Sequence, residues 1–177
     1  MAAIKGRRCL KLDWAIYLRE LELQVFGGAN SHAHEIKRDQ LSLVESNFQA
    51  LLEKTQHHNS KMREQAAKEL GVSSHPKACY ALIDLLKDGS HHVSWAAMHS
   101  LISLRRIAVR PLLEELTRDF QSSCFRSASR HILSELHRLG DLNEHEVHVL
   151  HSLTHDDKGL TIAKAANKAL ISSKHYT

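Results

Sequence analysis

The feature that most constrains the fold of this chain is a repeat in its middle. Residues 78–86 and 108–116 share one pattern of Ala, Leu and an acidic residue, 30 positions apart. Upstream of each, residues 61–71 and 92–101 have apolar side chains at helical spacing. Because self-similarity with a period of 20–50 residues is typical of solenoids, the sequence predicts a recurring pair of helices.

Glycine and proline punctuate this pattern as helix pairs require. Gly71 follows Leu70 where we expect a helix to end, because glycine accepts the left-handed conformation of a helix C-cap. Ser74 can cap the next helix, and Pro76 suits its first turn, where a missing N–H costs nothing. Pro111 is expected close to a helix start for the same reason. The connections should therefore be short.

Weaker helical patterns flank the clear repeats and complete the predicted architecture. They cover residues 12–26, 35–54, 125–136, 144–153 and 162–170. We predict an all-α fold of about eight helices, a short right-handed α-solenoid of about four helix pairs in one domain over 1–177. Its parts are an N-terminal capping pair (10–58), three repeats (59–88, 89–119, 120–154) and a C-terminal capping helix, not paired in a repeat (155–177). End caps shield the terminal core of a solenoid.

Composition agrees with helices and excludes several classes of protein. Seven glycines and two prolines are too few for the many turns of a sheet protein. No apolar run approaches the roughly 20 residues of a membrane span, and no signal peptide is evident, so a cytoplasmic protein is expected. The three cysteines are far apart, which argues against a disulfide framework. A net charge of +4 permits nucleic-acid binding without requiring it.

The clear repeats resemble a known family. Met62-Arg63-x-x-Ala66-Ala67-x-x-Leu70-Gly71 is similar to the V-R-x-x-A-A-x-x-L-G signature of HEAT repeats of the phycobilisome-lyase type. Ala108-Val109-x-Pro111-Leu112-Leu113 resembles the second-helix pattern of the same repeats. The similarity covers roughly residues 59–118. It implies stacked helix pairs whose second helices line a concave surface, and it specifies little about function.

The non-core positions of these second helices are the predicted partner-binding residues. They form a mixed, somewhat basic set with one aromatic side chain, and Arg and Tyr are frequent at binding hot spots. The set comprises Lys77, Tyr80, Asp84, Lys87, Arg106, Arg110, Glu114, Arg118, His145 and His148. A solvated helix face with no partner would also have such charges. We predict a non-catalytic adaptor or scaffold that binds a protein or peptide.

Two alternative functions stay open at this level. A nucleic-acid binder similar to HEAT-like DNA glycosylases is compatible with Arg105, Arg106, Arg110 and Trp95, and the repeat type is shared with bilin lyase subunits. No phosphate-binding loop, nucleophile elbow or zinc-protease motif is present, and no cofactor is expected. Among fifteen histidines, His148 and His151 are weak candidates for a metal site, because imidazoles at this spacing share a helix face.

Overall fold

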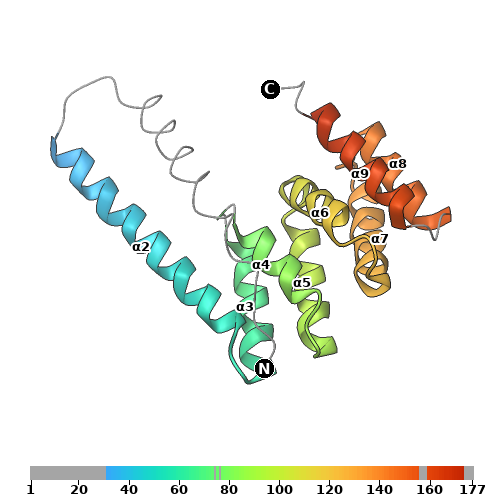
Figure 1. Cartoon of the computed structure of the whole chain (residues 1–177). Helices are drawn as coiled ribbons and strands as arrows, with labels where there is room; N and C mark the ends of the chain where they lie inside the picture. Colours follow the sequence, from blue (N-terminus) through green and yellow to red (C-terminus); the bar gives the residue numbers. More distant parts are fainter. Residues whose placement is uncertain (1–30, 74, 76, 156–158, 174–177) are drawn as a thin grey trace. The chain divides into compact units, whose positions relative to one another are not determined.

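The computed structural model describes residues 31–73, 75, 77–155 and 159–173, and all regular structure in this part is helical. The helices are α2 (Ser31–Thr55), α3 (Ser60–Val72), α4 (Ala78–Leu85), α5 (His91–Ser103), α6 (Arg106–Arg118), α7 (Ser123–Arg138), α8 (Glu144–His155) and α9 (Gly159–Ser173) (Figure 1). The predicted all-α fold is therefore confirmed. The helix expected over 12–26, like Ser74 and Pro76, lies outside the described residues.

Residues 45–177 group into one compact unit and residues 1–44 into another. The second unit contains the end of α2 and helices α3–α9, whereas the described part of the first is the beginning of α2. The prediction of a single domain over 1–177, with its repeat boundaries, stays a prediction.

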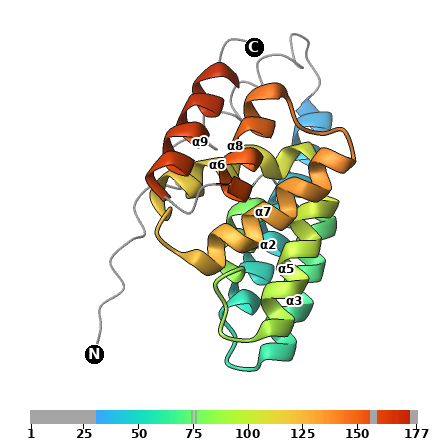
Figure 2. The same cartoon turned by 90° about the vertical axis from the view of Figure 1, so that its right-hand side faces the viewer.

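The helices of residues 45–177 pack in the order expected of a solenoid. The first helices α3, α5 and α7 pack successively, α3 on α5 and α5 on α7 (Figure 2), and the second helices α4 and α6 pack on each other. Their shared core consists mainly of Ala, Leu, Val and Ile, with Leu70, Leu82, Leu101 and Leu112 fully buried. One repeat cannot bury its apolar face alone, so stacking neighbours stabilises each of them.

The last helix departs from a simple continuation of the stack. Helix α9, expected without a partner in a repeat, packs on both α6 and α8 (Figures 1 and 2). Its buried residues are Ile162, Ala166 and Ala169. The N-terminus of α9 lies directly against the α6–α7 connection, where a Cβ on Gly159 would be 2.4 Å from the carbonyl oxygen of Phe120. Only glycine permits so close an approach.

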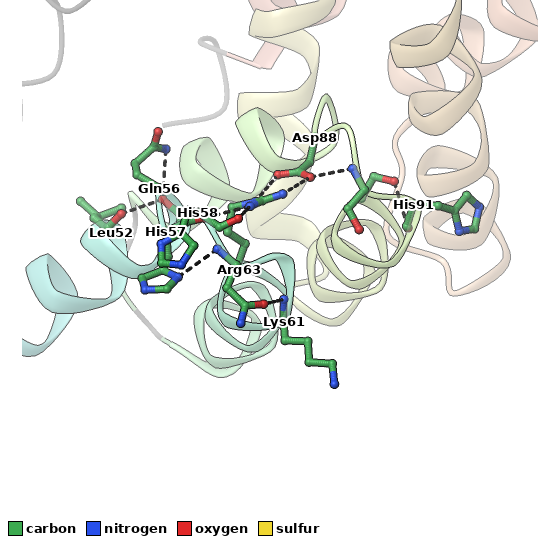
Figure 3. A network of polar contacts seen from close by, with 12 residues as sticks. Leu52, Gln56, His57, His58, Lys61, Arg63, Asp88 and His91 are labelled. Atoms are coloured by element: carbon green, nitrogen blue, oxygen red, sulfur yellow. Dashed lines mark hydrogen bonds and ion pairs between the residues drawn. The ribbon is translucent and has the colours of Figure 1, made fainter.

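An arginine near the start of α3 ties its helix to the neighbouring connections (Figure 3). Arg63 Nε and Nη2 donate to the two carboxylate oxygens of Asp88 at 2.7 and 2.9 Å. Its Nη1 donates to the carbonyl oxygens of His57 and His58 at 2.8 and 3.0 Å. Such a bidentate pair fixes both position and orientation. It explains why Arg is favoured at this point of the repeat signature.

The two carbonyl contacts of this arginine recur in α7 and are absent from α5. Arg126 Nη1 donates to the carbonyl oxygens of Phe120 and Gln121, again six and five residues upstream. The equivalent residue of α5 is Ser94, whose hydroxyl donates to His91 of its own helix. The repeat that contains α5 therefore lacks these arginine contacts and is held by its buried apolar side chains.

Two local expectations about helix ends are wrong, each for a physical reason. Gly71 is not a left-handed cap, since α3 continues to Val72 and ends at the extended residue Ser73. Pro111 is not in the first turn of α6, which begins at Arg106, so it lies inside the helix, where it is buried. The one glycine of the described residues with a positive φ is Gly140, at +78°, which reverses the chain after α7.

Candidate functional site

Five of the predicted residues of α4 and α6 interact with one another across this helix pair. Tyr80 on α4 donates its hydroxyl hydrogen to Glu114 Oε2 on α6 at 2.9 Å. The other oxygen of Glu114 accepts from Arg110 Nε at 3.1 Å, so this carboxylate bridges the two side chains. The charge of Arg118 acts on Tyr80, and the charge of Glu115 acts on Asp84. The structure thus brings five predicted residues together.

A second set of contacts closes the other end of this surface. Lys87 lies in the turn after α4, and its Nζ is 2.7 Å from Glu115 Oε1 and 2.8 Å from Asp119 Oδ2. It also lies 5.0 Å from the centre of the Phe125 ring, a cation–π distance. We call the surface formed by Tyr80, Asp84, Lys87, Arg110, Glu114, Glu115, Arg118 and Asp119 the α4/α6 face.

The α4/α6 face is not basic. It contains three cations (Lys87, Arg110, Arg118) and four carboxylates (Asp84, Glu114, Glu115, Asp119). Glu115 and Asp119 were not singled out from the sequence, because a helical pattern alone does not tell which acidic residue lies opposite Lys87. The expected excess of positive charge is therefore cancelled within the face.

The pKa shifts follow from this arrangement. Burial, then the hydrogen bond and charge of Glu114, raises the pKa of Tyr80 to about 12. Desolvation raises the pKa of Asp84, and Glu115 acts in the same direction, although the Asp84 side chain still meets solvent. For Lys87, desolvation lowers the pKa, but the hydrogen bonds to Asp119 and Glu115 outweigh it, so the net pKa is raised. At neutral pH Tyr80 is therefore a hydrogen-bond donor.

Two other predicted residues hold the fold together. Arg106 Nη1 pairs with the buried carboxylate of Glu146 on α8 and donates to the carbonyl oxygen of Asp141 at 2.9 Å. Lys77 precedes α4 and lies 4.0 Å from Glu45 Oε1. Glu45 also contacts His75 at 3.1 Å, whose ring stacks on Phe48 with centroids 3.6 Å apart. These contacts of Arg106 and Lys77 thus lie within the unit of residues 45–177 and do not involve the six predicted residues of the α4/α6 face.

The predicted histidines lie on α8. His145 and His148 are exposed, and no described contact joins them to the α4/α6 face. His151 has its ring stacked with that of His155, with centroids 6.0 Å apart. No group of three or more His, Cys, Asp or Glu side chains in the described ranges could hold a metal ion. A site built on His148 and His151 therefore has no further protein ligand there.

No helix in the described part of the chain has both the length and the apolar character that crossing a bilayer requires.

Comparison with known proteins gives one match. The family model of HEAT repeats matches residues 48–134, from the buried Phe48 of α2 to Ser134 of α7. The match begins before and ends after the similar stretch of roughly residues 59–118. The phycobilisome-lyase subtype stays a prediction. No curated protein and no solved structure matches the chain.

Proposed function

We propose that this chain acts as a non-catalytic adaptor that binds a protein partner on its α4/α6 face. The proposal starts from its membership of the HEAT-like repeat proteins over residues 48–134. HEAT repeats are commonly protein-interaction scaffolds, and the match specifies no partner. The partner is placed on this surface because of the contacts between α4 and α6.

The observation that supports this surface most is the ordered polar network of Tyr80, Arg110 and Glu114. Their side chains are held by mutual hydrogen bonds at 2.9 and 3.1 Å before any partner arrives. A partner therefore meets side chains that have already lost most of their rotamer freedom, which lowers the entropic cost of association. Tyr and Arg are also the residues that most often dominate interface energies.

The charge balance of the face favours a protein over a nucleic acid. Nucleic-acid binding depends on an excess of Lys and Arg that neutralises phosphates. Here Lys87 is paired with Glu115 and Asp119, and Arg110 with Glu114. A phosphate backbone would have to displace these carboxylates, whereas a protein surface of mixed charge can complement them.

The test uses two matched charge reversals. Arg110→Glu/Arg118→Glu changes exposed residues of the α4/α6 face, and Lys164→Glu/Lys168→Glu makes the same change at exposed positions of α9. Each purified chain captures its partner from nuclease-treated native lysate, and the partner is identified by mass spectrometry and then titrated as a purified component.

The proposal requires one purified protein that binds the wild type and the α9 variant equally and binds the α4/α6 variant at least about tenfold more weakly, a change of about 1.4 kcal/mol. Loss of the bound material on nuclease treatment, together with log affinity that falls steeply with log salt concentration, would identify a nucleic-acid binder instead.

A further inference from the structure

A groove between α7 and α8 is separate from the α4/α6 face. Its volume is about 430 Å³, and it is open to solvent. Val147 and Leu150 of α8 give it an apolar part, while Ser134 and Thr154 add hydroxyl groups. The groove can therefore take at least one apolar side chain without excluding polar neighbours.

The ionisable residues that line this groove are one arginine and four histidines. Helix α7 contributes Arg130, His131 and His137, and α8 contributes His151 and His155. No carboxylate in the described ranges lines the groove. Arg130 forms no ion pair within the described residues, and the four imidazoles form none either. Asp156 and Asp157 follow in the sequence and lie outside the described residues.

The charged groups around the groove do not cancel this character. Glu135 of α7 is held by Arg138, whose Nη2 and Nε donate to its Oε2 at 2.8 and 3.0 Å. That hydrogen bond, and then the charges of Arg138, His131 and His99, lower the pKa of Glu135. His99 belongs to α5, which packs on α7. No ion pair of the described part joins the groove imidazoles to α6 or α9.

The position of the groove in the stack explains why it is open. In a solenoid the first helix of each repeat packs on the first helix of the next. Helix α7 packs on α5, α6 and α8, whereas α9 packs on α6 and α8. The side of α7 that lines the groove is exposed and has polar side chains, whereas packing on a further repeat would need apolar ones. These polar residues are Arg130, Ser134 and His137.

We propose that the α7/α8 groove binds an acidic peptide segment with an apolar side chain. Carboxylates complement the Arg130 guanidinium, because a charged donor and a charged acceptor form the strongest hydrogen bonds. The groove imidazoles add N–H donors for the same carboxylates. The apolar side chain of the peptide contacts Val147 and Leu150. This inference does not rest on the α4/α6 face.

The chemistry of the groove favours an anionic ligand over a metal ion. Four imidazoles line it, yet no three of them, nor any three with a Cys or carboxylate of the described ranges, are placed to share one ion. The rings of His151 and His155 are stacked, and each imidazole can donate an N–H hydrogen bond. Two adjacent donors suit neighbouring carboxylates of one peptide.

The experiment measures fluorescence anisotropy of a labelled peptide Glu-Asp-Leu-Glu-Asp-Phe-Glu with the full chain. One control peptide has Gln and Asn in place of Glu and Asp, and another has Ser in place of Leu and Phe. His151→Gln/His155→Gln removes two groove imidazoles, and His91→Gln/His92→Gln removes two exposed imidazoles of α5. Circular dichroism establishes that each variant is folded.

The proposal requires that the acidic peptide bind more tightly than both control peptides, and that only the groove variant lose about tenfold in affinity. No binding of the acidic peptide, or equal losses in the two variants, would overturn it. So would a single-stranded oligoribonucleotide that binds the wild type more tightly than the peptide and depends on the same two histidines. Neither result bears on the α4/α6 face, which has its own variants.

Discussion

Replacing Gly71 by alanine tests the closest helix contact of the fold. Gly71 lies in the last turn of α3, and a Cβ built there would be 2.5 Å from Ser100 Oγ and 2.6 Å from Ser100 Cβ on α5. Carbon atoms in contact prefer separations of about 3.5–4.0 Å, so the new methyl group would overlap Ser100 by about 1 Å. Ser100 cannot simply rotate away, because its buried hydroxyl donates to the carbonyl oxygen of Ala67 at 2.9 Å.

The expected loss of stability can be assembled from three contributions. Overpacking a tight contact costs about 1–3 kcal/mol, and disturbing the Ser100–Ala67 hydrogen bond costs about 1 kcal/mol. Alanine is a better helix former than glycine by about 1 kcal/mol, which acts in the opposite direction. We therefore expect Gly71→Ala to lower the free energy of unfolding by about 1–3 kcal/mol. In the absence of the contact, the same substitution would stabilise the chain.

The measurement is urea denaturation followed by circular dichroism, with Gly89→Ala as the matched control. Nothing lies within 4 Å of a Cβ at Gly89, and its φ is not positive, so that substitution should be neutral or slightly stabilising. The double variant Gly71→Ala/Ser100→Gly removes the two closest atoms and should lose less stability than the two single variants added together. If Gly71→Ala stabilises the chain as Gly89→Ala does, the proposed close packing of α3 on α5 is wrong.

Three further predictions test the core, a buried thiol and an ion pair. Leu82→Ala should lower the free energy of unfolding by about 2–5 kcal/mol, because Leu82 is fully buried, and urea denaturation measures this loss. Burial raises the pKa of Cys79 to about 11. In a variant whose other two cysteines are serine, this thiol should therefore react with Ellman's reagent at pH 8 only after unfolding. Rapid reaction of the native chain would contradict the burial of Cys79. The hydrogen bond from Arg63 lowers the pKa of Asp88 in the folded chain. The ion pair therefore stabilises the fold above the pKa of an unfolded Asp, about 3.9, and this stabilisation is lost as the pH falls through the pKa of the folded chain. Urea midpoints between pH 5 and 3 should therefore fall more steeply for the wild type than for Asp88→Asn, and parallel curves would rule the ion pair out as a source of acid lability.

Most of the candidate site could be predicted from the sequence, but its charge could not. The helical period places Tyr80 and Asp84 on one side of α4, with Lys87 in the turn that follows, and the repeat carries the same positions to α6. The contact of Tyr80 with Glu114 follows from that register. Which carboxylates neutralise the cations depends on how α4 and α6 cross, and a crossing geometry is set by side-chain packing in three dimensions.

Arg106 shows the same limit more sharply. Its place on a second helix predicted a partner contact, yet its guanidinium pairs with Glu146, 40 residues further along the chain. Sequence patterns within one helix contain no information about a neighbour at that separation. Arg106 therefore joins α6 to α8 in the folded chain, and its contact with a partner stays a prediction.

By itself, the sequence determined that this chain forms helices in stacked pairs, because the apolar period and the recurrence of Ala and Leu are local properties. It marked Gly71 as special but suggested the wrong cause, since a cap and a close helix contact both demand glycine. Only the tertiary structure decided that Gly71 faces Ser100, that α9 packs on α6 and α8, and that a histidine-lined groove stays open between α7 and α8. Each of these depends on which surfaces meet, and the balance of packing over the whole core settles that.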